Sequence, residues 1–180
     1  NEHFWDPKDA DYIDYQSAPP SAGPLIPFSM IPERHSAIWD TLDEKGQLEF
    51  ANESLRARIS GILHGEQGAL SLSTGLADMF IDPGAQEYAT NQAREESRHV
   101  HAFSLYMRSR FNGEITPVTS TLGRILSAMV ASEVIYEKVI GMQMIIEGIA
   151  MGLFASMYQE ANDPLLRRLC QLVMTDESFH

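Results

Sequence analysis

Cysteine and basic residues are scarce in this chain of 180 residues. Cys170 is the single cysteine, which excludes disulfide scaffolds and cysteine-based zinc sites and fits a reducing, cytoplasmic location. Lysine and arginine number 13 against 25 aspartates and glutamates, so the formal net charge is −12. We therefore expect neither nucleic acid nor an anionic membrane surface as a partner.

Long apolar runs are lacking too. The most apolar stretch, residues 139–158, is interrupted by Gln143 and Glu147, and no basic-plus-apolar leader opens the chain, so a membrane span is disfavoured. No glycine-rich phosphate loop is present. Apolar residues make up 44% of the chain, enough for one domain with a proper core.

Prolines are concentrated near the N-terminus, where they forbid a long helix. Pro19, Pro20, Pro24, Pro27 and Pro32 all lie there. We therefore predict an irregular, wrapping arm over residues 1–47, with one short helix near residues 36–43. From residue 48 onward apolar residues recur at three- and four-residue steps, which indicates helix.

Four long helices follow from their start and stop signals. The first covers residues 48–80, and Asp82-Pro83 opens a second that ends at Asn112-Gly113. Residues 119–160 hold a short lead-in helix and a main helix starting near Ser132. Asp163-Pro164 opens the last, which we expect to continue to His180 and beyond. Short loops between such helices predict an all-α, four-helix bundle over residues 48–180.

A repeated pattern of acids and histidines stands out on these helices. Two Glu-x-x-His units are present, and residues three apart on a helix share a face. Thirty residues before each unit lies another glutamate, and the whole trio recurs at an offset of 81. The six candidate metal ligands are Glu66, Glu96, His99, Glu147, Glu177 and His180.

This ligand set predicts a pair of metal ions. Two helices giving one glutamate each and two giving Glu-x-x-His is the plan of carboxylate-bridged dimetal sites. Four carboxylates with two neutral imidazoles carry −4, which two divalent cations balance. Oxygen and nitrogen ligands favour iron or manganese. We therefore predict two iron ions, or one manganese and one iron, that pass electrons to O₂.

Two acids that are next to ligands in the sequence are candidates to hydrogen-bond the ligand histidines. Asp176 precedes Glu177 and Glu95 precedes Glu96, so we expect the two acids to hold His99 and His180 respectively. Tyr106 and Tyr136 return to the ligand faces of their helices and are interpreted as ordinary core tyrosines. Met144 is expected to pack in the core. Small residues near the ligands are expected to give a substrate access: Gly65, Gly68, Ala69, Gly148 and Ala150.

With this ligand pattern the chain resembles the ferritin-like superfamily, in the branch of the ribonucleotide reductase small subunit and its related ligand-binding oxidases. The Asp-Glu-x-x-His unit at residues 176–180 and the Phe-Trp-x-Pro segment at residues 4–7 carry the likeness. In that family the tryptophan contacts the aspartate and helps to move electrons to the metals. The resemblance therefore implies this role for Trp5 and Asp176, whereas an aromatic plug that holds the arm down is the alternative for Trp5.

The sequence differs from several branches of this family at positions that their functions require, which argues against those functions. Phe103 stands where tyrosyl-radical subunits carry tyrosine, and a subfamily with phenylalanine there uses manganese and iron. Ala69 and Met142 replace the crosslinked pair of the ligand-binding oxidases, and Val173 replaces the extra histidine of arylamine N-oxygenases.

These observations favour an O₂-activating dimetal oxidoreductase that oxidises an organic substrate in an apolar pocket. The expected partners are an apolar or amphipathic small molecule, an external electron donor and a second copy of the chain in a homodimer. A radical-generating subunit and a ferroxidase or iron-storage protein remain the alternatives.

Overall fold

The computed structural model describes residues 4–21 and 23–180, and all regular secondary structure there is helical, as the all-α prediction requires. Before the first long helix there are only single-turn 3₁₀ segments. The elements in chain order are the 3₁₀ turns Phe28–Met30, Pro32–His35 and Trp39–Thr41, then α1 (Glu44–Met79), α2 (Pro83–Phe111), α3 (Ser120–Ala131), α4 (Ile135–Val139), a π-helical segment (Ile140–Ile146), α5 (Glu147–Glu160) and α6 (Pro164–Glu177).

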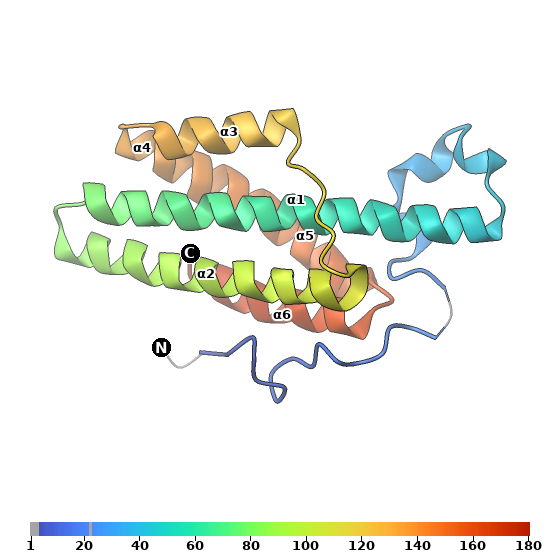
Figure 1. Cartoon of the computed structure of the whole chain (residues 1–180). Coiled ribbons are helices and arrows are strands. Elements are labelled where there is room, and N and C mark those ends of the chain that lie inside the picture. Colours follow the sequence, from blue (N-terminus) through green and yellow to red (C-terminus); the bar gives the residue numbers. More distant parts are fainter. Residues whose placement is uncertain (1–3, 22) are drawn as a thin grey trace.

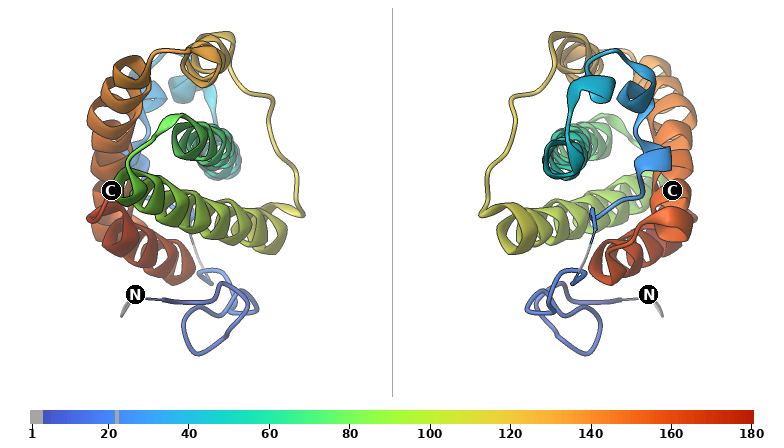
Figure 2. Two further views of the ribbon diagram at one scale, coloured as in Figure 1. Left: turned by 90° about the vertical axis from the view of Figure 1, so that its left-hand side faces the viewer. Right: turned by 90° about the vertical axis from the view of Figure 1, so that its right-hand side faces the viewer.

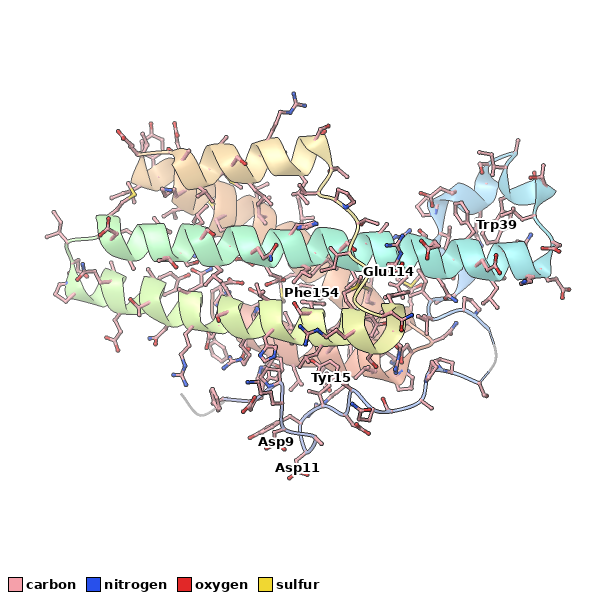
Figure 3. The ribbon with its side chains drawn as sticks, in the orientation of Figure 1. Asp9, Asp11, Tyr15, Trp39, Glu114 and Phe154 are labelled. Atoms are coloured by element: carbon pink, nitrogen blue, oxygen red, sulfur yellow. The ribbon has the colours of Figure 1, made fainter. Side chains whose placement is uncertain are left out.

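The long helices lie side by side around one core. α1 and α2 form an antiparallel pair, α5 packs on α6, and α6 contacts α2 (Figures 1 and 2). α3 and α4 cover α1 on its far side from α2 (Figure 1). Figure 3 shows Phe154 of α5 among the side chains of the core, where its ring stacks on Phe103 of α2 at 5.8 Å between centroids. The apolar stripes of the helices thus meet in one large cluster, and a smaller second cluster joins α1, α2 and the π-helical segment through Leu72, Ala89 and Met142.

Aspartate-proline pairs start two helices, as the sequence predicts. The Asp82 carboxylate accepts a hydrogen bond from the main-chain N–H of Ala85, and the Asp163 carboxylate accepts one from Leu165. Each satisfies a donor that has no partner within its helix. Asn112 ends α2 in the left-handed conformation, with φ of 53°.

Three predicted boundaries are wrong. α1 begins at Glu44 rather than at residue 48, because Asp43 caps it by accepting from the Gly46 N–H. The short helix expected at residues 36–43 is reduced to the 3₁₀ turn Trp39–Thr41. α6 ends at Glu177, because the N–H groups of Phe179 and His180 bond to carbonyls three residues back and tighten the last turn.

The arm before α1 packs on the helices through apolar side chains. Trp5, Ile13, Ile26 and Ile31 are all buried. Trp39 makes edge-on contacts with Phe28 and Phe50 beside the N-terminal half of α1 (Figure 3). Burial of these groups ties an otherwise irregular segment to the helical body.

The stretch from α4 to α5 is apolar but largely exposed. By length and composition Ile135–Glu160 would suffice to cross a membrane, with mean hydropathy 1.6 over an 18-residue window that is 17% buried. Tyr136 and Met144, expected on the ligand face and in the core, are 65% and 70% exposed. The π-helical segment turns these positions outward, because π turns hold more residues than α turns.

Candidate metal centre

All six predicted ligands meet in one buried place. They form two groups, in each of which one oxygen or nitrogen atom per residue lies within 4.8 Å of the others. The first group, called here the His99 group, is Glu66, Glu96, His99 and Glu177. The second, the His180 group, is Glu96, Glu147, Glu177 and His180. Two glutamates therefore belong to both groups.

Four helices, α1, α2, α5 and α6, together with the turn after α6, supply the ligands. Glu66 lies in the middle of α1, while Glu96 and His99 lie one turn apart on α2. Glu147 is the first residue of α5 and Glu177 is the last of α6. His180 follows three residues after Glu177, and its tight last turn keeps it on the same face. Because distant segments supply the ligands, packing of the helices builds the cluster.

The shared glutamates divide their oxygens between the two histidines. Oε1 of Glu177 lies 3.1 Å from Nδ1 of His99, and its Oε2 lies 2.5 Å from Nδ1 of His180. Oε2 of Glu96 lies 3.6 Å from the same atom of His99, and its Oε1 lies 3.4 Å from that of His180. Each shared glutamate thus offers one oxygen to each ligand group.

The outer nitrogen of each imidazole is held by the acid that precedes a shared glutamate. Nε2 of His99 lies 3.0 Å from Oδ2 of Asp176, and Nε2 of His180 lies 3.0 Å from Oε2 of Glu95. Both contacts are those expected from the sequence. A carboxylate at Nε2 favours a proton on that nitrogen, so Nδ1 is the nitrogen that faces the glutamates and would ligate a metal ion once deprotonated.

Asp176 has further partners that the helix pattern does not reveal. Its Oδ2 accepts from Nε1 of Trp5 at 2.8 Å and from Nη2 of Arg98 at 2.7 Å. The Arg98 guanidinium lies 5.3 Å from the Trp5 ring centroid. The tryptophan of the arm is therefore joined to His99 through a single carboxylate.

The pKa values of several side chains in the cluster are strongly shifted. Burial raises the pKa of Glu66 to about 8 and, with the charges of Glu177 and Glu96, that of Glu147 to about 10. Burial acts oppositely on the imidazole of His180, but contacts with Glu177 and Glu95 outweigh it and raise the pKa to about 10. Such pKa shifts occur where burial and neighbouring charges act together on several titratable groups, as they do at functional sites.

The chemistry of this site fits a pair of cations. Oε2 of Glu96 and Nδ1 of His99 are buried and have no hydrogen-bond partner. Buried polar atoms without a hydrogen-bond partner are rare in proteins, and carboxylates that converge on one another repel. Two divalent ions would satisfy these atoms and balance four carboxylates. Carboxylate oxygens with imidazole nitrogens suit iron and manganese.

Two amides next to the ligands are absent from the sequence-based site. Gln92 donates from Nε2 to Oε1 of Glu96 and to Oε1 of Glu147, at 3.3 Å each. Gln143 donates to Oε1 of Gln92 at 2.5 Å. The signal that finds them is spacing, since each glutamine precedes a ligand glutamate by four residues and so lies on its face.

The remaining candidates lie outside the cluster. Tyr106 is buried and donates from its hydroxyl to Asp163 at 3.0 Å, so it has the structural role expected. The structure leaves room for a substrate at some of the small residues predicted to give access, but not at all of them. A Cβ on Gly68 would lie 2.8 Å from a methyl of Leu126, whereas one on Gly148 or Gly65 would meet no atom within 4 Å.

The site is therefore a buried, twofold-repeated set of carboxylates and imidazoles with its own hydrogen-bonded surroundings. Comparisons with family models, with curated proteins and with solved structures find no match to this chain.

Proposed function

We propose that this chain is a dimetal oxidoreductase that activates O₂ to oxidise an organic substrate, on a four-helix bundle of the ferritin-like type. The observation that carries the proposal is the sharing of Glu96 and Glu177 between two ligand groups. A single metal site needs no shared carboxylates, whereas a metal pair does.

The residues divide into ligands of each ion and ligands of both. Glu66 and His99 would hold one ion, Glu147 and His180 the other, and the two shared glutamates would span them. Bound in the reduced state, two irons or a manganese and an iron supply the electrons that O₂ accepts. Asp176 fixes the His99 ring.

The surroundings support an oxidising site protected from water. Phe103, Phe154 and Cys170 are fully buried in the core beside the His99 group. Gly148, next to Glu147, is exposed and has open space where a side chain would be, so an apolar or amphipathic substrate would approach from this side. The buried aromatic side of the site suits chemistry from which water is excluded.

The link from the arm to the ligands supports an external electron donor. Trp5 and His99 share Oδ2 of Asp176, so a hydrogen-bonded chain runs from the arm to the cluster. The same chain favours a second candidate, a radical-generating subunit that acts on a separate partner. Phe103 weighs against a radical at the position beside His99, because phenylalanine has no hydroxyl to oxidise.

Titration of the metal-free protein with ferrous iron, without oxygen, tests the proposal. We expect two irons per chain, and then O₂ consumption on exposure to air, with an oxidised product when cell extract supplies the substrate. Glu96→Ala should lose both irons, whereas Glu87→Gln, an exposed acid on the same helix, should keep them. Absence of iron and manganese binding, or unchanged binding in Glu96→Ala, would contradict the proposal. A shell of 24 subunits would favour storage.

A further inference from the structure

Gln92 is a buried amide that contacts two of the proposed ligands at once. Its side chain is 1% exposed and lies one turn before Glu96 on α2. Its Nε2 lies 3.3 Å from Oε1 of Glu96 and 3.3 Å from Oε1 of Glu147. With metal bound these carboxylates would be ionised, and an N–H group that faces an ionised oxygen makes a stronger hydrogen bond than one between neutral groups.

A chain of hydrogen bonds fixes which way this amide points. Nε2 of Gln143 donates to Oε1 of Gln92 at 2.5 Å and to the hydroxyl of Tyr88 at 3.0 Å. The Tyr88 hydroxyl in turn donates to the main-chain carbonyl of His180. Oε1 of Gln92 is occupied by this donor, so its NH₂ group faces the two carboxylates and Oε1 of Gln143, which lies 3.2 Å from Nε2.

The network is placed asymmetrically between the two ligand groups. It joins α2, the π-helical segment and the turn after α6, which lie next to or carry the ligands of the His180 group. Glu147 and His180, which belong only to that group, are both reached by it. Glu66, at the other end of the cluster, lies with its Oε2 3.3 Å from Nδ1 of His99.

We propose that Gln92 is a positioning residue for the metal of the His180 group, an inference that rests on the dimetal function proposed above. By binding Oε1 of Glu147 it holds that carboxylate on the cluster side of α5. Gln143 acts through Gln92, because it sets the orientation of the amide. The Glu96 oxygen that Gln92 binds, Oε1, is the one that faces His180, so the network acts mainly on the metal position of the His180 group.

Stepwise titration of the metal-free protein with Mn²⁺, followed by electron paramagnetic resonance, tests this assignment. Gln92→Met removes the donor with little change of volume, and thermal unfolding of the metal-free variants checks that they fold. We expect the affinity for the Mn²⁺ ion of the His180 group to fall about 10- to 100-fold in Gln92→Met. The affinity for the ion of the His99 group should change less than about twofold. Glu147→Gln and Glu66→Gln identify which equivalent is which. Gln86→Met, on the exposed side of α2, is the matched control.

The double variant separates positioning from a merely structural effect. Gln143→Met should weaken the same equivalent in the wild type and have no further effect beside Gln92→Met. Gln92→Asn, which keeps an amide, should restore part of the affinity if Gln92→Met fails to fold or binds weakly. Equal weakening of both equivalents, or none, would overturn the role of Gln92. Failure of the wild type to bind two ions would instead overturn the dimetal function itself.

Discussion

Oδ2 of Asp176 lies 3.0 Å from Nε2 of His99, although the two residues are 77 positions apart in the chain. The same oxygen accepts hydrogen bonds from Trp5 and Arg98. One atom therefore sets the tautomer of a proposed ligand, pairs with a buried guanidinium and fastens the N-terminal arm. Changes at this position should affect the metal centre more than changes at an exposed acid.

Asp176→Asn should weaken metal binding by the His99 group. The amide of asparagine carries no charge to balance Arg98, and it replaces one carboxylate oxygen by an NH₂ group that cannot accept a hydrogen bond. The His99 ring therefore loses the contact that fixes its orientation. We expect a loss of about 10- to 100-fold in affinity, measured by metal titration of the metal-free protein. Glu87→Gln serves as the control for loss of one acid. Equal affinities in Asp176→Asn and the wild type would contradict the role of this contact.

Single ligand substitutions should separate the two groups. Glu66→Gln removes a ligand from the His99 group alone, and Glu147→Gln removes one from the His180 group alone. We expect each to reduce bound Mn²⁺ from about two to about one per chain, as the ligand sets predict. Glu177→Gln should weaken both equivalents, because this residue belongs to both groups. Elemental analysis after gel filtration measures the ratio, and retention of two ions by Glu177→Gln would rule out the shared arrangement.

Metal binding should release protons. Without metal, Glu66 with a pKa of about 8 and Glu147 with a pKa of about 10 are mainly protonated at pH 7, as is His180 with a pKa of about 10. Because ions compete with these protons, the apparent affinity should rise as the pH increases from about 6 to about 8. Calorimetric titrations in buffers of different ionisation enthalpy measure the protons released. An observed binding enthalpy that is the same in every buffer would contradict the prediction.

The two aspartate caps should differ in their contribution to stability. Asp163 is fully buried and accepts from Tyr106 and from Nε of Arg110 at 2.8 Å, whereas Asp82 is exposed. Asp163→Ala leaves the Arg110 charge buried without its partner and should lower the free energy of unfolding by about 3–5 kcal/mol. Asp82→Ala loses only a cap, about 1 kcal/mol. Urea unfolding compares them, and similar losses would show that the Arg110 pair contributes little.

Features set by local rules could be predicted from the sequence. Asp82 and Asp163 start helices because a short carboxylate and a following proline satisfy the first turn. Glu96 and His99 share a face because helical geometry is regular over one turn, and the repeat of this unit at residues 177–180 places the second pair. Even the contact of Asp176 with His99 follows, since a ligand histidine needs a partner at its outer nitrogen.

Other features of the fold and of the site depend on tertiary geometry, which the sequence pattern does not contain. Tyr136 and Met144 were placed by assuming a continuous α-helix up to Glu147, and the π-helical segment breaks that register. Gln92 and Gln143 carry no charge, so a search for acids and histidines passes over them. Their importance comes from being opposite one another on two helices, which only the packed structure reveals.

Because Glu177 belongs to both ligand groups, it determines when the site can form during synthesis of the chain. Neither group can close until residue 177 has emerged from the ribosome, long after α1 and α2 have been made. The nascent helix pair must therefore carry Glu66, Glu96 and His99 through synthesis without their partners from α6. On the proposed dimetal function, metal loading therefore follows the docking of α6.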